Sequence, residues 1–241
     1  MIRVVWTALV GWIATLYWGP AVLYQAMRGR KGTDWYVYVT RNWARTILWA
    51  SGCDVVVHGM ENVRPGQPQV IVSNHVSWFD VFAIASVLEV PFHFVAKKEL
   101  ERIPLFGPAW KAAGHISIDR SNRERAIASL EEAAQKIRRE ASAVVIFPEG
   151  TRSRSGRLQP FKKGAFQLAR SSGVALVPTV VTGSRAVMPP GDWRIRANTI
   201  HVHFLPPIDA AAAAGPEELM ESAYSVMLRA LLDERGIPAH T

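Results

Sequence analysis

The chain has 241 residues, of which 49% are hydrophobic and 20% are charged, a composition typical of a folded globular protein. Its single cysteine, Cys53, excludes an intramolecular disulfide framework and fits a reducing compartment, and we expect it to be a small buried residue. The net charge of +8 indicates an anionic partner, which could be a nucleic acid, an acidic lipid or a phosphorylated substrate.

The positive charge is concentrated in two stretches of the chain. Residues 1–53 contain six lysines and arginines but one acidic residue, Asp34. Residues 150–191 contain no acidic residue. Their basic residues are Arg152, Arg154, Arg157, Lys162, Lys163, Arg170 and Arg185. A charge run alone usually marks a solvated face, but two stretches this unbalanced, one of them beside an apolar segment, favour binding to an anionic surface or substrate.

The N-terminal residues predict a helix that associates with a membrane. Val4–Met27 contains no charged residue. As a helix it would extend about 36 Å, enough to cross a hydrocarbon core of about 30 Å. Gly19-Pro20 interrupts the apolar run and is expected to kink the helix. The run is long for a signal peptide, and no small-x-small cleavage site precedes the basic cluster at residues 28–31.

A second helical stretch, Thr33–Ser51, combines tryptophan and tyrosine with Arg41 and Arg45, a mixture that suits the headgroup layer. We therefore assign residues 1–52 to a membrane-associated helical pair and residues 53–241 to a separate α/β domain. The pair is either a spanning helix with an interfacial helix, or a hairpin that enters one leaflet. Two helices packed on a soluble core are the alternative.

Beyond Gly52, short β-branched runs alternate with helical stretches, which predicts an α/β fold with a mostly parallel or mixed sheet flanked by helices. The expected strands are Asp54–Val57, Val70–Ser73, Phe92–Ala96, His115–Ile118, Ala143–Phe147, Ala175–Val181 and Thr199–Phe204. The expected helices are Trp78–Leu88, Asn122–Glu140, with Ser121 and Glu124 as a capping box, Lys163–Ser171 and Pro216–Glu234.

Several common site motifs are absent from the sequence. It contains no GxGxxG, GxxxxGK[ST], HExxH, CxxC or GxSxG motif, which removes sequence support for nucleotide, common zinc and nucleophile-elbow sites. His201 and His203 share one face of an expected strand and could in principle bind a metal ion. Because no acidic or cysteine ligand lies nearby in sequence, packing is the favoured interpretation, and we expect no metal.

The first candidate site is the segment Asn74–Asp80, between an expected strand and an expected helix, where open α/β sheets bind ligands. His75 can accept a proton near neutral pH if a carboxylate on its other ring nitrogen fixes the tautomer. Asp80 is near enough in sequence to supply that carboxylate. Ser77-x-x-Asp80 is also a capping box, so Asp80 could instead cap the helix. Taken alone, the segment leaves both interpretations open.

Four segments in order resemble the glycerolipid acyltransferases, in particular the bacterial 1-acylglycerol-3-phosphate acyltransferases. They cover roughly residues 70–181, and the apolar N-terminus is similar in kind. The segments are Asn74-His75-x4-Asp80, Ala96–Leu100 with Ile103–Gly107, Phe147–Ser153 and Val177–Val181. Thr179 departs mildly from the family, which often has valine there.

The resemblance implies that His75, held by Asp80, is a general base for acyl transfer to a lysolipid. We assign substrate binding to Lys97, Glu149, Gly150, Thr151 and Arg152. Arg152 offers a planar fork for phosphate and Lys97 a point charge. Glu149 is expected to orient Arg152, contact the acceptor or brace the loop. Structural roles remain for Pro104, Gly107 and Pro108, which are expected to shape a loop, and for Pro178, which is expected to break a strand.

The implied reaction gives phosphatidic acid from 1-acylglycerol-3-phosphate (lysophosphatidic acid), with acyl-CoA or acyl-carrier protein as co-substrate and no cofactor or metal. The expected partner surface is a phospholipid bilayer, not nucleic acid. The expected location is the bacterial inner membrane, with the catalytic domain facing the cytoplasm. Alternatives are an acyltransferase for another lysolipid, a lipid hydrolase that uses Ser77 with His75, or a non-catalytic lipid-binding protein.

Overall fold

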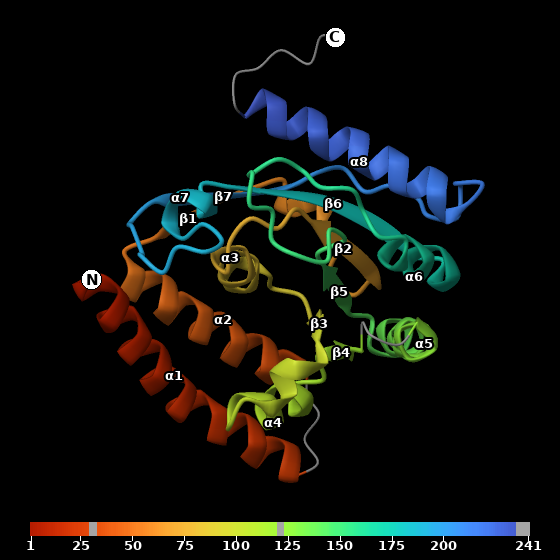
Figure 1. Cartoon of the computed structure of the whole chain (residues 1–241). Helices are drawn as coiled ribbons and strands as arrows, with labels where there is room; N and C mark the ends of the chain where they lie inside the picture. Colours follow the sequence, from red (N-terminus) through yellow and green to blue (C-terminus); the bar gives the residue numbers. More distant parts are fainter. Residues whose placement is uncertain (29–32, 120–122, 235–241) are drawn as a thin grey trace.

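The structure is a computed structural model that describes residues 1–28, 33–119 and 123–234. Its centre is a seven-stranded sheet with the order β1-β7-β6-β2-β5-β3-β4 (Figure 1). The strands are β1 (Asp54–His58), β2 (Gln69–Ser73), β3 (Phe92–Lys97), β4 (Ile116–Ile118), β5 (Ala143–Ile146), β6 (Ala175–Thr182) and β7 (Thr199–Phe204). All neighbouring pairs are parallel except β6 and β7, which are antiparallel. The expected mixed α/β fold is therefore confirmed.

Helices cover both faces of the sheet. They are α1 (Ile2–Met27), α2 (Thr33–Ser51), α3 (Phe79–Val87), α4 (Phe106–Ala112), α5 (Arg123–Glu140), α6 (Gly164–Ser172), α7 (Ser184–Val187) and α8 (Pro216–Asp233). Two short 3-10 helices complete the set: η1 (Met60–Asn62) lies between β1 and β2, and η2 (Lys98–Arg102) lies between β3 and α4. The strand boundaries differ from those expected by at most one residue, and those of β7 match at both ends. The expected cap at Ser121 lies outside the described residues.

The central strand β2 shows why the sheet needs helices on both sides. All five of its residues are buried, and alternate side chains enter different cores. Ile71 packs in the core shared with α2 and α3, whereas Val70 and Val72 pack in the core shared with α5, α6 and α8. Figure 1 shows α8 on one side of the sheet and α2 and α3 on the other. The carboxyl end of β2 is thus fixed between two packed layers.

The N-terminal helix α1 lies along α2 and α4 (Figure 1). Its buried residues, Thr7, Ala14, Gly19 and Val22, are spread over its length. Hydrogen bonds also join the pair: Arg3 Nη1 donates to the Ser51 carbonyl at 2.7 Å. The helix continues through Gly19-Pro20, and the expected kink at this point stays a prediction. Proline leaves one carbonyl of the preceding turn without its helical partner but does not end the helix here.

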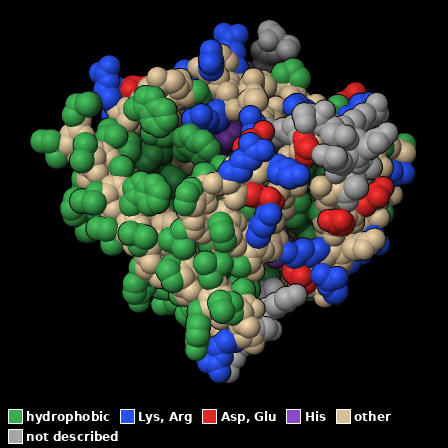
Figure 2. Space-filling view, turned by 60° about the horizontal axis from the view of Figure 1, so that its bottom comes forward, with side chains coloured by type: hydrophobic (Ala, Val, Ile, Leu, Met, Phe, Trp, Pro, Cys, Tyr) green, Lys and Arg blue, Asp and Glu red, His purple; other side chains and the backbone are tan. Residues whose placement is uncertain are grey.

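The other side of α1 is apolar and open to the surroundings. Among the described helices, α1 is the one long and apolar enough to cross a membrane. Figure 2 shows hydrophobic side chains gathered on one face around a hollow, with most charged side chains to one side of them. The large exposed hydrophobic residues of the helical pair are Ile2, Val5, Trp6, Leu9, Trp12, Ile13, Leu16, Tyr17, Tyr24, Met27, Tyr38 and Trp49. A contiguous apolar face of this kind marks an interaction surface.

Two local expectations are corrected by the structure. Gly107 and Pro108 lie in the first turn of α4 rather than in a loop, because proline needs no hydrogen-bond donor there and a Cβ on residue 107 would come within 2.0 Å of the Glu101 carbonyl. Pro178 does not break β6. Its carbonyl accepts from Leu205 N–H at 2.8 Å, and Leu205 follows the last residue of β7. The missing N–H of Pro178 is therefore on the side of β6 where the pairing with β7 ends, and the strand continues.

Candidate active site

The turn that carries His75 is fixed by hydrogen bonds to the neighbouring strands. Asn74 Nδ2 donates to the Val181 carbonyl at 2.9 Å, and Val181 N–H donates to Asn74 Oδ1 at 2.8 Å. The carbonyl of His75 accepts from Ser153 N–H at 2.7 Å. These contacts bring the segments after β2 and β5 to the carboxyl end of β6, as expected for neighbouring parallel strands.

His75 and Asp80 form a hydrogen-bonded pair. His75 Nδ1 lies 2.8 Å from Asp80 Oδ2, and Asp80 is fully buried. Because the carboxylate accepts hydrogen bonds, this contact selects the tautomer of the neutral ring that carries its proton on Nδ1 and a lone pair on Nε2. Among the described residues, no group forms a hydrogen bond with His75 Nε2. The ring also stacks on Phe147, with centroids 4.1 Å apart. His75 therefore has a fixed orientation and a free basic nitrogen.

Asp80 also caps the start of the helix. The same oxygen, Oδ2, accepts from Val76 N–H at 2.7 Å and from Ser77 N–H at 2.9 Å. The second of these contacts is half of the capping box that the sequence contains. The two interpretations of Asp80 are compatible, because one oxygen serves both the imidazole and the backbone.

Ser77 is committed to structure rather than to chemistry. It is fully buried, its hydroxyl donates to the Met188 carbonyl at 2.8 Å, and it accepts from Phe79 N–H at 3.2 Å. The contact with Met188 holds the turn between β2 and α3 against the loop after α7, and the contact with Phe79 fixes the start of α3. This geometry offers no support for the hydrolase alternative, which requires a hydroxyl that points at the substrate.

Glu149 joins the loop after β5 to the turn that carries His75. Its Oε1 accepts from His75 N–H at 2.7 Å, and its Oε2 accepts from Gln159 N–H at 3.2 Å and from Gln159 Nε2 at 2.9 Å. Burial raises the pKa of Glu149, and these hydrogen bonds oppose the rise. Of the three expected roles, bracing the loop is the one that the contacts favour. Gln159 was not identified from the sequence.

Arg152 lies over the ring of Trp78, with its guanidinium carbon 4.8 Å from the ring centroid. This is a cation–π contact that holds the guanidinium beside the turn that carries His75. Burial lowers the pKa of Arg152, and the negative charge of Asp80 opposes that change. Gly150 sits just before, with φ of +76°, where a Cβ would come within 2.9 Å of the Lys162 side chain. The platform formed by Trp78 was not predicted.

The expected site residues meet at a large apolar cavity of about 1350 Å³. His75, Lys97, Gly150, Thr151 and Arg152 line it, and Glu149 lies behind them. The remaining wall comes mainly from α1, α2, α3 and α4. It includes Gly11, Thr15, Val22, Trp43, Phe82, Ala85, Phe106 and Trp110. Pockets for small molecules typically measure roughly 300–1,000 Å³, so this cavity has room for a long apolar group. Its N-terminal wall was not foreseen from the sequence.

The basic stretch at residues 150–191 does not form one patch. Arg152 and Arg154 line the cavity. Lys163 instead pairs with Glu217 at 2.6 Å, and Arg170 donates to the Ala213 carbonyl. Only part of the positive charge is therefore available for an anionic substrate.

Comparisons with known proteins identify the family of the chain. The sequence model of the family described as Acyltransferase matches residues 54–182. The chain is 39% identical over 163 residues to the 1-acyl-sn-glycerol-3-phosphate acyltransferase of Limnanthes douglasii, with 68% of this chain and 57% of that protein covered. It is 35% identical over 198 residues to the human 1-acyl-sn-glycerol-3-phosphate acyltransferase alpha, with 82% and 69% covered.

A solved structure shares the fold over almost the whole chain. The 1-acyl-sn-glycerophosphate (LPA) acyltransferase PlsC from Thermotoga maritima superposes with a TM-score of 0.85 at 23% identity, covering 99% of this chain and 97% of that one. The chain spans 57–63% of the length of the first three curated relatives that it matches. On the family match and the identity to these relatives, the chain belongs to the acyltransferase family.

Proposed function

We propose that the protein transfers a fatty acyl group from an acyl thioester to the free hydroxyl of 1-acylglycerol-3-phosphate, giving phosphatidic acid. The observation that carries this proposal is the His75–Asp80 pair on the wall of a large apolar cavity, with the hydrogen bond at 2.8 Å. The names of the relatives, which are 1-acylglycerol-3-phosphate acyltransferases, support the acceptor. Acyl-CoA or acyl-carrier protein is the proposed co-substrate, and the reaction needs no cofactor.

The proposed chemistry is direct transfer. His75 Nε2 takes the proton of the acceptor hydroxyl while the oxygen attacks the thioester carbonyl carbon. The tetrahedral intermediate then collapses, the carbon–sulfur bond breaks, and the departing thiolate receives the proton from the imidazolium. Asp80 stabilises that imidazolium and keeps Nε2 directed at the substrate. General base catalysis supplies about 10²–10⁴-fold, and positioning of both substrates supplies more.

Arg152 and Lys97 are the proposed phosphate ligands of the acceptor. Arg152 has a planar fork of donors that matches two phosphate oxygens, and Trp78 holds it 4.8 Å from the ring centroid. Lys97 is the exposed last residue of β3 and lines the same cavity. Both lie on the wall that also carries His75, which supports recognition of a phosphate and deprotonation of a hydroxyl on one substrate.

The acyl chain is proposed to lie in the cavity between the N-terminal helices and α3 and α4. Apolar side chains from both sides face this space. The helical pair is proposed to enter one leaflet rather than span the bilayer, because the inner side of α1 is covered by the domain from Thr7 to Val22. The exposed apolar side would then contact lipid, and donor and acceptor chains could enter the cavity from it.

The decisive test is a panel of acceptors assayed with the purified protein and a long-chain acyl thioester. We expect acylation of lysophosphatidic acid and weak or no acylation of lysophosphatidylcholine or monoacylglycerol. Preference for another lysolipid would overturn the acceptor. Release of thiol without any acceptor, in an initial burst, would overturn direct transfer in favour of hydrolysis.

Membrane attachment is tested separately by extraction. Screening by salt weakens the attraction of lysine and arginine for anionic headgroups, whereas apolar insertion persists. We expect the full chain to stay with membranes in high salt and to be released by detergent. Release into the soluble fraction by salt alone would show that surface charge, not the apolar face of α1, holds the protein.

A further inference from the structure

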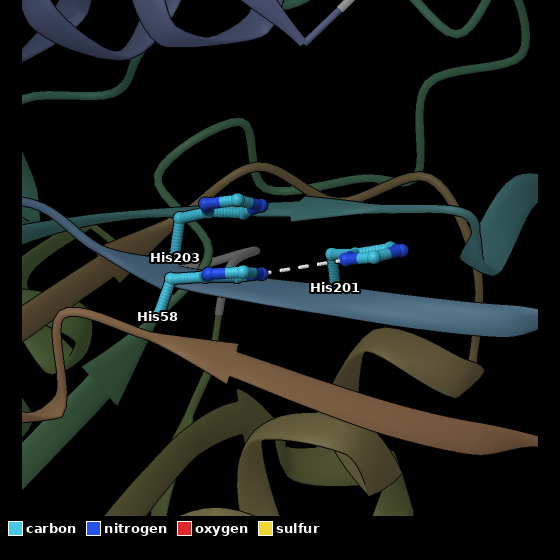
Figure 3. Close-up of side chains that lie close together, drawn as sticks. All are labelled: His58, His201 and His203. Carbon is cyan, nitrogen blue, oxygen red and sulfur yellow. Dashed lines mark hydrogen bonds between the residues drawn. The ribbon is translucent and has the colours of Figure 1, made fainter.

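Three histidines from two strands lie together on the face of the sheet that α8 covers, away from the cavity. His58 ends β1 and is the direct register partner of His203 in β7. His201 precedes His203 by two residues, so its side chain is on the same face of the strand. The alternate residues of β7, Ile200, Val202 and Phe204, point to the other face of the sheet, into the core shared with α2 and α3. Two paired strands thus place three imidazoles side by side (Figure 3).

The nitrogen atoms of the three rings are close enough to share one ion. One ligand nitrogen from each histidine lies within 4.8 Å of the other two. His58 Nε2 and His201 Nδ1 face each other at 3.5 Å, as the dashed line in Figure 3 marks. Zinc–nitrogen bonds of about 2.0–2.1 Å in a tetrahedral site separate two nitrogens by about 3.3 Å. The observed separation is near that value without a movement of the backbone.

The cluster also contains a ring nitrogen without a hydrogen bond and a nearby carboxylate. His203 Nε2 is buried and has no hydrogen-bond partner among the described residues. Glu234, which follows the end of α8, places Oε1 at 3.4 Å from it. This distance is longer than the about 2.7–3.2 Å of an ordinary N–H···O hydrogen bond, so the nitrogen retains the capacity to bind a ligand.

We propose that His58, His201 and His203 bind a late first-row divalent metal ion, with Zn²⁺ as the best fit. Imidazole is a preferred ligand of zinc, copper and nickel, and three histidines with one further ligand give a tetrahedral site. Glu234 or a water molecule supplies the fourth position. The rings of His58 and His203 now stack with planes 9° apart, so binding turns their side chains until the lone pairs converge. His58 is exposed on the edge strand β1, which leaves room for that rotation.

The proposed ion has a structural effect rather than a role in acyl transfer. None of the three histidines lines the cavity that holds His75. A bound ion would join β1, β7 and, through Glu234, the end of α8, three segments that approach each other only in the folded chain. An ion that binds the folded state raises its stability. This inference does not depend on the proposed function.

The test is metal binding by the full-length protein, without an affinity tag and stripped with a chelator. Zn²⁺ affinity is measured by competition with a chromogenic chelator, and Co²⁺ absorption reports coordination geometry. We expect one ion per chain, a tetrahedral Co²⁺ spectrum and a higher Tm with Zn²⁺. His58→Gln and His201→Gln should each weaken binding by more than the roughly 10–100-fold that loss of an outer-shell partner costs. His75→Ala is the matched control and should bind like the wild type.

Each alternative outcome overturns the proposal. Wild-type protein that binds no stoichiometric metal, or glutamine variants that bind like the wild type, would show that the three rings only pack. Loss of binding in His75→Ala would place the ion at the catalytic pair. Circular dichroism and acyl transfer of the metal-free variants show that they are folded, since neither replaced side chain reaches the cavity.

Discussion

The two ends of the cavity wall are built in different ways. At the strand ends, His75, Asp80 and Glu149 are joined to one another and to the backbone by hydrogen bonds of 2.7–2.9 Å. On the N-terminal side, apolar contacts dominate, and a hydrogen bond such as that of Trp43 Nε1 to Thr15 Oγ1 at 3.0 Å is the exception. Under the proposed function, the polar end would fix the direction of the reacting atoms, whereas the apolar end would fix the volume left for substrate. Changes at the two ends should therefore affect different kinetic constants.

The largest effect is expected at the catalytic pair. His75→Ala removes the base. General base catalysis supplies about 10²–10⁴-fold, so kcat should fall by this factor or more, with membrane attachment unchanged. Asp80→Asn should lose most activity too, because an amide can hold the ring in the wrong tautomer. It should also lower stability by about 1 kcal/mol, because a neutral amide replaces the charged oxygen that accepts from Val76 and Ser77 N–H. Steady-state kinetics and thermal unfolding separate the two effects. Near-full turnover with reduced stability would leave Asp80 as a cap only.

Arg152 tests whether the polar end also recognises the acceptor. Arg152→Lys keeps the charge but loses the bidentate geometry and the contact with Trp78, so it should not be conservative. We expect KM for lysophosphatidic acid to rise about tenfold or more, a loss of about 1.4 kcal/mol, with kcat falling as well if the contact aligns the hydroxyl. The comparison is with a neutral monoacylglycerol. Equal proportional losses on both acceptors would mean that Arg152 braces the loop or serves the donor.

The apolar end is tested by reducing the cavity. Gly11 lines the cavity, and a Cβ added there would contact Ile47 at an ordinary 3.8 Å. A larger side chain at this position should therefore fit and fill part of the cavity. Gly11→Leu should lower kcat/KM for the longest acyl thioesters by about tenfold, the scale of one or two methylene contacts, and leave short ones unchanged. Ile13→Phe is the matched control, since Ile13 is exposed on the same helix and does not line the cavity. Equal loss with all chain lengths would place the acyl chain elsewhere.

The strand-end region was predictable from the sequence because its signals are local. His75 and Asp80 lie five residues apart, and the turn between β2 and α3 brings them together with little help from the rest of the fold. The strands were identified from β-branched runs, since β2 and β5 are buried on both faces. The order of the strands and the opposite direction of β7 depend on long-range pairing, for which no single segment carries the information.

The apolar region and the histidine cluster could not be predicted, because they too depend on contacts between segments far apart in the sequence. The cavity exists because α1 packs against α2 and α4, and the first turn of α4 contains Gly107 and Pro108, which local propensity assigns to a loop. His58 and His201 are separated by 143 residues, so only the pairing of β1 with β7 shows that they meet. Gln159 and Trp78 likewise gain their roles from the groups that the fold brings to them.

The smallest effect is expected from the buried carboxyl group behind His75. Burial raises the pKa of Glu149, so the folded chain holds this proton more readily than the unfolded chain does. The stability that this difference contributes is present at low pH and is lost as the pH rises through the folded-state pKa. Glu149→Gln cannot titrate, so the stability of the variant relative to the wild type should increase over this interval. Urea unfolding of both proteins from about pH 4 to pH 8 measures the difference. Parallel curves would mean that Glu149 titrates alike in both states. Turnover should fall only modestly, because the glutamine oxygen can still accept from His75 N–H while its amide group no longer accepts from Gln159. A loss as large as that of His75→Ala would instead place Glu149 in direct contact with the substrate.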